Sequence, residues 1–172
     1  MPSPDPQGSA TATFLHGLAV ISRSDIFATG AIVHDVDPGQ NVILRWNGSS
    51  WQSMKSPGSD TLDEGLSSVA AVSASDAWAV GGSLNQASGK NTTLILHWNG
   101  TKWLTQPVPV PRGADNDGLQ SITGVSAKAA WAVGASSNAS GSVQRPLLMH
   151  WNGTHWTTVS LPSTLIGAAQ RG

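Results

Sequence analysis

Residues 75–81 read Ser-Asp-Ala-Trp-Ala-Val-Gly, and residues 97–103 read His-Trp-Asn-Gly-Thr-Lys-Trp. Related versions of both stretches precede and follow them in the chain, the first at residues 24–30 and 128–134 and the second at residues 45–51 and 150–156. The first Trp of the second stretch recurs at intervals of 52 and 53 residues. A period near 50 residues is typical of repeat architectures, so this repeat decides the fold.

The middle copy contains four short segments with the composition of β-strands, at residues 66–73, 77–83, 92–98 and 101–108. The Asn-Gly pair between the last two segments predicts a hairpin with a two-residue type I′ turn. In that register Trp98 pairs with Thr101 and Leu96 pairs with Trp103. The Asn-Gly turn occurs once in each copy, as Asn47-Gly48, Asn99-Gly100 and Asn152-Gly153.

Each hairpin carries two Trp on one face of its sheet, and two copies have a further Trp in the second strand. Large rings at equivalent positions of every repeat are expected to pack between sheets, since each buries about 150–250 Å². An aromatic platform for a sugar is the alternative. The expected packing residues are Trp46, Trp51, Trp78, Trp98, Trp103, Trp131, Trp151 and Trp156.

Four short antiparallel strands per repeat predict an all-β fold in which each repeat is one four-stranded blade of a β-propeller. The expected blades are residues 14–64, 65–117 and 118–163. Residues 1–13 are expected to be a linker or the remnant of a preceding blade, and residues 164–172 a connector to a next blade. Propellers close with about 4–8 blades, so we expect an incomplete ring or a fragment of a larger propeller.

The run Trp78-Ala79-Val80-Gly81-Gly82, followed by an apolar strand and a spaced Trp pair, resembles a kelch blade. The Gly-Gly doublet is Gly-Ala in the other two copies. The repeats are more similar still to a group of bacterial repeats with the signature Ser-x-Asp-x-Trp-Ala-Val-Gly and His-Trp-Asn-Gly-Thr-x-Trp, found in large exported proteins. The resemblance covers residues 14–163 and implies a propeller scaffold and an extracellular or cell-surface location.

The composition excludes several classes of function. The 172 residues include no Cys and carry a net charge of −1, with 11% charged residues. Such a chain has no disulfide framework and no basic patch for nucleic acid. It has no apolar run long enough to insert into a membrane, and its first residues show no signal peptide.

Loops on one rim of the predicted propeller vary between copies, whereas the turns on the other rim are short and alike. The variable rim is expected to hold the loops 31–41, 83–91 and 136–146 together with the connectors between blades. Loops on a rigid scaffold commonly carry function, so we expect the ligand there. Simple solvation of polar loop tips is the alternative. The candidate binding residues are Asp35, Asp37, Asp60, Asp63, Glu64, Asn85, Lys90, Asp115, Asn116, Asp117 and Arg145.

The four acids Asp63, Glu64, Asp115 and Asp117 are expected to tolerate joint replacement by Ser or Asn with little effect on folding. Residues 35–39 and 115–118 place acids around Gly in a pattern resembling a calcium loop, but without EF-hand spacing. His97 and His150 fall in different blades, on the sheet face opposite the paired Trp. We therefore expect no metal ion and no cofactor.

The sequence contains no Tyr and a single Glu, so it offers no tyrosine nucleophile and no carboxylate pair that can be assigned as glycosidase acid and base. We expect a non-catalytic binding or interaction module within a larger exported or cell-surface bacterial protein. Its ligand would be a protein segment or a polysaccharide. A structural spacer and a carbohydrate-binding lectin are the alternatives. The two end faces are built from the same repeat, which predicts association with further blades or with a second copy.

Overall fold

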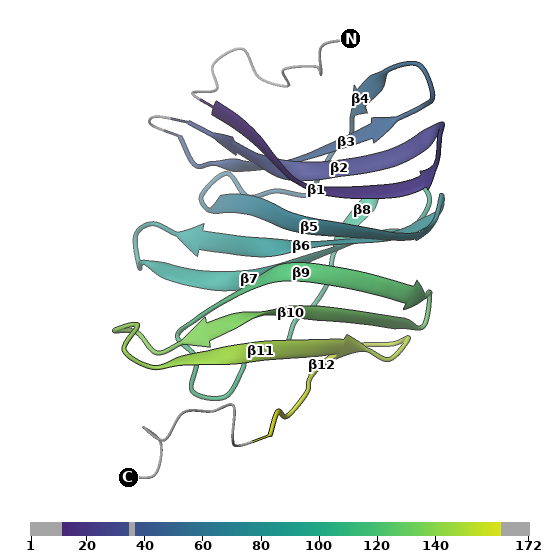
Figure 1. Cartoon of the computed structure of the whole chain (residues 1–172). Coiled ribbons are helices and arrows are strands. Elements are labelled where there is room, and N and C mark those ends of the chain that lie inside the picture. The colour runs from purple at the N-terminus through teal and green to yellow at the C-terminus, as the bar shows by residue number, and fades with distance from the viewer. Residues whose placement is uncertain (1–11, 35–36, 163–172) are drawn as a thin grey trace.

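The chain folds into three β-sheets that lie one on another as successive layers (Figure 1). The structure is a computed structural model and describes residues 12–34 and 37–162. All regular secondary structure in these residues is β-strand. Each sheet holds four strands that are consecutive in the sequence and antiparallel, so each repeat folds as one blade.

The strands follow the repeat along the chain. Blade 1 contains β1 (Ala12–Ser22), β2 (Asp25–Val33), β3 (Gln40–Trp46) and β4 (Trp51–Ser53). Blade 2 contains β5 (Asp63–Ser73), β6 (Asp76–Asn85), β7 (Lys90–Trp98) and β8 (Trp103–Thr105). Blade 3 contains β9 (Asn116–Ser126), β10 (Ala129–Ser137), β11 (Gln144–Trp151) and β12 (Trp156–Thr158). The predicted all-β fold of three four-stranded blades is confirmed, while the predictions for residues 1–11 and 163–172 lie outside the described residues.

The fourth strand of each blade is shorter than the sequence predicted. In blade 2 it ends at Thr105 rather than at Val108. Gln106 still donates its main-chain N–H to the carbonyl of Ile95, at 2.9 Å. The next residue is Pro107, which has no N–H to donate, so the ladder of hydrogen bonds stops there.

The Asn-Gly hairpin differs from the predicted two-residue turn. Trp98 pairs with Trp103, not with Thr101, and Leu96 pairs with Thr105, so the loop holds four residues. Gly100 has a φ of +91°, but no described residue other than glycine has a positive φ, and a type I′ turn needs two. Asn99 instead caps the loop with its side chain. Its Oδ1 accepts hydrogen bonds from both main-chain N–H groups at residues 101 and 102, at 3.0 Å, and from the Thr101 hydroxyl at 2.8 Å.

The Gly that closes the Trp-Ala-Val-Gly stretch is required by a β-bulge in the first strand of its blade. In blade 2 the pairing of β5 with β6 shifts between Leu66 and Ser68, which brings the Gly65 carbonyl close to Gly81. A Cβ on Gly81 would lie 1.9 Å from that oxygen. The equivalent glycines of blades 1 and 3 show the same close approach, so the position excludes every other residue.

Aromatic rings join blade 2 to blade 3. Trp78 is fully buried and stacks on His97 of its own sheet, with ring centroids 4.1 Å apart. On its other side it meets two rings of blade 3, Trp151 at 5.0 Å and Trp156 at 5.4 Å, the latter edge to face. We call this arrangement the ring clasp: a ring backed by a basic side chain of its own blade and covered by the Trp pair of the next. Trp78, Trp151 and Trp156 thus pack between two sheets, whereas Trp46, Trp51 and Trp131 of the predicted set lie on outer faces of blades 1 and 3 that no described sheet covers.

The same clasp joins blade 1 to blade 2 with different residues. Phe27 is fully buried, and the guanidinium of Arg45 lies 4.9 Å from the centre of its ring. Trp98 and Trp103 of blade 2 meet the Phe27 ring at 6.1 and 5.6 Å, both edge to face. Each such ring pair contributes about 0.5–1.5 kcal/mol beyond the area that it buries.

Truncation of the clasp should therefore cost stability. We expect Trp103→Ala to lower the free energy of unfolding by about 3–5 kcal/mol, as large aromatic truncations do, measured by urea denaturation. Trp51→Ala is the matched control, since Trp51 holds the same position in blade 1 on a face that no described sheet covers, and its loss should be smaller. A Trp103→Ala protein as stable as the parent would contradict the packing role.

Candidate binding site on the variable rim

The variable rim is formed by the loops between the second and third strands and by the connectors between blades. The connectors are residues 54–62 and 106–115, and the loops in blades 2 and 3 are residues 86–89 and 138–143. These loops are shorter than predicted, because β6 and β10 continue to Asn85 and Ser137. Strand pairing therefore holds part of the expected binding loops rigid.

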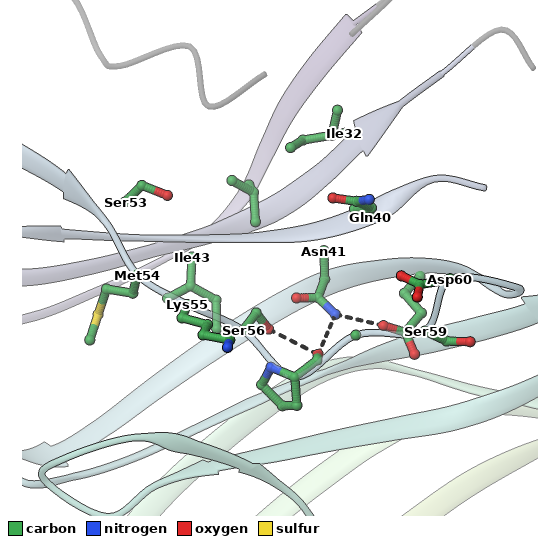
Figure 2. A pocket seen from close by; sticks show the side chains of 14 residues that line it. Ile32, Gln40, Asn41, Ile43, Ser53, Met54, Lys55, Ser56, Ser59 and Asp60 are labelled. Carbon is green, nitrogen blue, oxygen red and sulfur yellow. Dashed lines mark hydrogen bonds between the residues drawn. The ribbon is translucent and has the colours of Figure 1, made fainter. Parts of the chain in front are cut away.

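A pocket of about 560 Å³ lies where the first connector passes the start of β3 (Figure 2). We call it the first rim pocket. Polar groups reach it from the strand, the connector and the start of β5. Its polar lining residues are Gln40, Asn41, Ser53, Lys55, Ser56, Ser59, Asp60 and Glu64.

Asn41 lies at the floor of this pocket and is 8% exposed. Its Nδ2 donates to the carbonyl of Pro57 at 3.2 Å and to Oε2 of Glu64 at 2.9 Å, as Figure 2 shows in part. Its Oδ1 is buried and has no hydrogen-bond partner. An unpaired buried acceptor is costly, which makes this atom a candidate contact for a ligand donor.

The carboxyl group of Glu64 is half-buried and accepts a hydrogen bond from Asn41. Burial raises the pKa of Glu64 above its ordinary value. Hydrogen bonds from the main chain of Ser59 and from Asn41 act in the opposite direction but do not cancel the effect. A positively charged donor entering the pocket would favour the ionised carboxylate.

A second rim pocket, of about 430 Å³, lies between blades 2 and 3. It is bounded by the first residues of β7 and β9 and by the ends of β10 and β11 that face the variable rim. Its polar lining residues are Ser67, Asn91, Asn116, Asp117, Gln120, Ser136, Ser137 and Gln144.

Several of the predicted binding residues join neighbouring blades through hydrogen bonds to the main chain. Asp63 accepts from the N–H of Gly39 in blade 1, at 2.5 Å. Asn116, at the equivalent position of blade 3, accepts from the N–H of Asn91 in blade 2, at 2.9 Å. The 7% exposed Asp117 accepts in the same way from the N–H at residue 93. These side chains tie each first strand to the preceding blade.

The other predicted residues are more exposed. Asp60 lines the first rim pocket and Asp37 is exposed, whereas Asp35 lies outside the described residues. Asp115 forms an ion pair of 3.7 Å with Lys90 and accepts from the N–H of Ala139 at 3.0 Å. Asn85 Oδ1 caps its own loop by accepting from the N–H at residue 88.

Arg145 and Gly113 lie close together on the boundary between blades 2 and 3, since a Cβ on Gly113 would come 3.4 Å from the guanidinium. The polar strand residues that line the pockets were not predicted from the sequence, above all Asn41, Gln40, Gln120 and Gln144. A polar residue at a strand end carries no sequence signal of its own, because its burial depends on where a connector passes.

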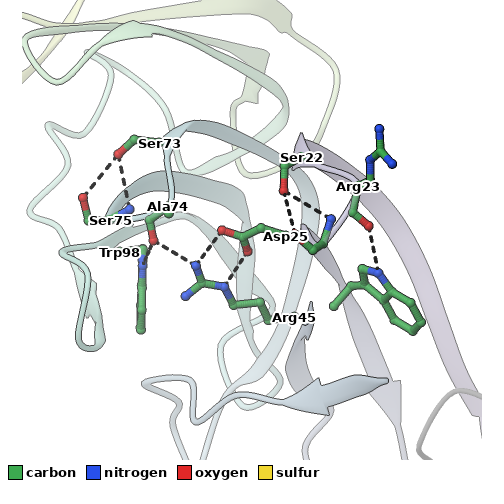
Figure 3. A network of polar contacts seen from close by, with 10 residues as sticks. Ser22, Arg23, Asp25, Arg45, Ser73, Ala74, Ser75 and Trp98 are labelled. Atoms are coloured by element: carbon green, nitrogen blue, oxygen red, sulfur yellow. Dashed lines mark hydrogen bonds and ion pairs between the residues drawn. The ribbon is translucent and has the colours of Figure 1, made fainter. Parts of the chain in front are cut away.

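On the opposite, uniform rim, charged side chains and Trp indoles form hydrogen bonds with the turns (Figure 3). Arg45 forms a bidentate ion pair with Asp25, at 2.7 and 2.8 Å, and also donates to the carbonyl of Ala74 in blade 2, at 3.1 Å. Trp98 donates its indole N–H to that carbonyl at 3.0 Å. His97 replaces Arg45 in blade 2, and its Nε2 lies 2.8 Å from Oδ1 of Asp76. The prediction that His97 packs on the face opposite the Trp pair, within a hydrogen bond, is confirmed.

Within residues 12–34 and 37–162, no group of three or more His, Asp or Glu is placed so that it could hold a metal ion. The same residues form no helix long and apolar enough to cross a bilayer.

No protein-family model matches the sequence, and no curated protein matches it. The structure is similar to that of YCF48 bound to a D1 peptide, with 16% identity and a TM-score of 0.52 over 96% of this chain and 47% of the other. This chain thus spans about half the length of that protein. A fucose lectin from Kordia zhangzhouensis in complex with methyl-fucoside gives 12% identity and a TM-score of 0.51, over 84% of this chain and 99% of the lectin chain. A GH74 xyloglucanase from Xanthomonas campestris gives 15% identity and a TM-score of 0.47, over 80% of this chain and 19% of the enzyme chain.

The sheets, their order and the similarities to YCF48 and to the lectin define the class: the chain consists of three blades of a β-propeller. The resemblance to kelch repeats in particular stays a prediction from the sequence.

The blade-joining hydrogen bonds revise the expectation that the acids can be replaced without effect on folding. We expect Asp117→Ala to lower the free energy of unfolding by about 1–3 kcal/mol, because it leaves the part-buried N–H at residue 93 without an acceptor. Asp60→Ala, at an exposed acid of the same rim, should change it by no more than about 0.5 kcal/mol. Thermal and urea denaturation of the two variants compare them directly, and equal stabilities would contradict the structural role of Asp117.

Proposed function

We propose that the chain is a non-catalytic binding module whose ligand is a protein segment held on the variable rim. The observation that carries the proposal is the unpaired, buried Oδ1 of Asn41 in the first rim pocket. Both rim pockets lie among segments that differ from repeat to repeat. Apart from the blade-joining Asn116 and Asp117, the residues of these segments are free to serve a ligand, because loops on a rigid scaffold tolerate variation.

The chemistry of the first rim pocket favours a ligand rich in hydrogen-bond donors. Asn41 offers an acceptor at the floor, Glu64 a carboxyl group beside it and Asp60 a second carboxyl group at the exposed edge. Among the described lining residues, Lys55 is the one cation. Main-chain N–H groups and Lys or Arg side chains of a protein segment match this set.

The described lining residues of the two rim pockets include no aromatic side chain. Five of the Trp residues pack in the two clasps, and the other three, Trp46, Trp51 and Trp131, lie on the outer faces of blades 1 and 3 and do not line either rim pocket. This distribution supports a protein segment over a polysaccharide. The solved propellers YCF48, bound to a D1 peptide, and the Kordia lectin, bound to methyl-fucoside, support binding as a role for the fold.

We place this module in a larger bacterial protein that is exported or displayed at the cell surface. The support for that location is the similarity of the repeat signature to repeats of exported bacterial proteins.

A random-peptide library displayed on phage and a panel of soluble polysaccharides test the proposed function on the same immobilised chain. We expect enrichment of peptides with Lys or Arg, and binding of the selected synthetic peptide in isothermal titration. The variant Asp60→Ala removes the exposed carboxylate of the pocket and should weaken the binding of a cationic peptide at least about tenfold.

Lys102→Ala is the control on the opposite rim, since Lys102 is an exposed charged residue in the hairpin loop there. It should leave the affinity unchanged. Binding of polysaccharides alone would make the chain a lectin, and no binding in either arm would make it a spacer. Either result contradicts the proposal, as would a peptide whose affinity responds to Lys102→Ala and not to the pocket variant.

A further inference from the structure

In the clasp, blade 2 presents a stacked Trp–His pair to blade 3. The outer face of blade 3 carries the same kind of pair. Trp131 stacks on His150 with ring centroids 4.2 Å apart and an interplanar angle of 28°, the same angle as for Trp78 on His97. Trp78 is fully buried, whereas Trp131 is 37% exposed. We call the outer surface of this sheet the tail face; its exposed apolar residues are Val125, Trp131 and Val133.

The outer face of blade 1 carries the other half of a clasp, the Trp pair that covers a ring. Trp46 and Trp51 form a pair with centroids 5.7 Å apart, as Trp98 and Trp103 do at 5.8 Å in blade 2. We call this surface the head face. Besides the Trp pair it exposes Leu15, Leu18 and Val20, which are 50%, 62% and 65% exposed.

The positions on the head face that are exposed in blade 1 are covered in blades 2 and 3. Leu15 corresponds to Leu66 and Leu119, which are at most 2% exposed. Leu18 corresponds in the same way to Val69 and Ile122, which are 6% and 7% exposed. The head face is thus a repeat surface that no sheet of the described residues covers.

We propose that the head face of one copy of this chain binds the tail face of a second copy, so that two copies close into a six-bladed ring. In each contact the Trp46 and Trp51 pair of one copy covers Trp131 of the other, which completes a third version of the clasp. Ser121 would meet the main-chain N–H of Leu18, as Ser68 meets that of Ile122 inside the chain, at 3.3 Å.

The area of the faces favours a closed ring over a single contact. Four short strands cover on the order of 350 Å² per face, from their spacing and rise. One head-to-tail contact would bury about 700 Å² in total, which is typical of weak contacts, whereas the two contacts of a ring bury about 1,400 Å², the size of a stable interface. When two copies close the ring, the head face and the tail face of each chain are both covered.

The contact between copies should be weaker than the contacts within the chain. Asp63 and Asn116 each hold the preceding blade through a main-chain N–H, but Ala12 occupies the corresponding position of β1. Thr13 likewise stands where blade 3 has Asp117. Without these acceptors the ring depends on its apolar faces, so we expect association in the micromolar range rather than a permanent dimer.

Sedimentation equilibrium of the full 172-residue chain tests this pairing. We expect a reversible equilibrium between one and two copies, with no larger species. Trp131→Glu blocks the tail face and Leu18→Glu the head face, and each should raise the dissociation constant at least about tenfold. Val110→Glu is the control, because Val110 is 73% exposed but lies in the connector between blades 2 and 3.

Circular dichroism shows whether each variant keeps its fold, and two variants on opposite faces keep the test informative if one of them unfolds. A chain that remains single at high concentration overturns the proposal. So does open-ended growth beyond two copies, or a dimer that withstands both Trp131→Glu and Leu18→Glu. Because no rim pocket residue is altered, the outcome is independent of ligand binding on the variable rim.

Discussion

The ring clasp between blades is the contact on which the rest of the structure depends. Trp78 and Phe27 each fill the space between two sheets, with a basic side chain behind them and a Trp pair in front. A four-stranded sheet of short strands cannot bury its faces alone, so each blade needs its neighbours. The clasp supplies apolar area at the centre of each contact and fixes the side-to-side position of one sheet on the next.

Polar contacts on the two rims stabilise the rest of the structure in different ways. On the uniform rim, Arg45 and Asp25 or His97 and Asp76 hold the turns close to the clasp. On the variable rim, Asp63, Asn116 and Asp117 tie each first strand to the blade before it. The pockets lie beside these ties rather than at the loop tips, so any ligand would rest against a rigid part of the scaffold.

The sequence was sufficient to predict the repeat, the strands and the packing of the five Trp residues in the two clasps, because those properties follow from local pattern and from repetition. It predicted the wrong hairpin register, since Asn-Gly fits a two-residue turn as well as a four-residue loop. The four-residue loop is favoured over the two-residue turn because Asn99 accepts hydrogen bonds from two main-chain N–H groups and from the hydroxyl of Thr101. A Ser or Thr after Asn-Gly in all three copies was the available signal.

The candidate site was predicted less well, because its geometry depends on the path of the connectors. The acids before each Gly-Leu pair looked like free rim residues, but Asp117 is buried against the main chain of the preceding blade. Asn41 showed no distinguishing pattern and became a pocket residue only through its contacts with Pro57 and Glu64. Such contacts join segments distant from one another in sequence, which local periodicity does not reveal.

A double-mutant cycle across one clasp tests most directly whether the rings hold the blades together. Trp78→Leu, Trp156→Leu and the double variant are compared in urea denaturation. The edge-to-face contact of these rings at 5.4 Å predicts a coupling free energy of about 1 kcal/mol. Trp78 and Trp46 point to different faces of the stack, so the losses of unfolding free energy caused by Trp78→Leu and Trp46→Leu should instead add. Additivity of Trp78→Leu and Trp156→Leu within about 0.3 kcal/mol would contradict the account.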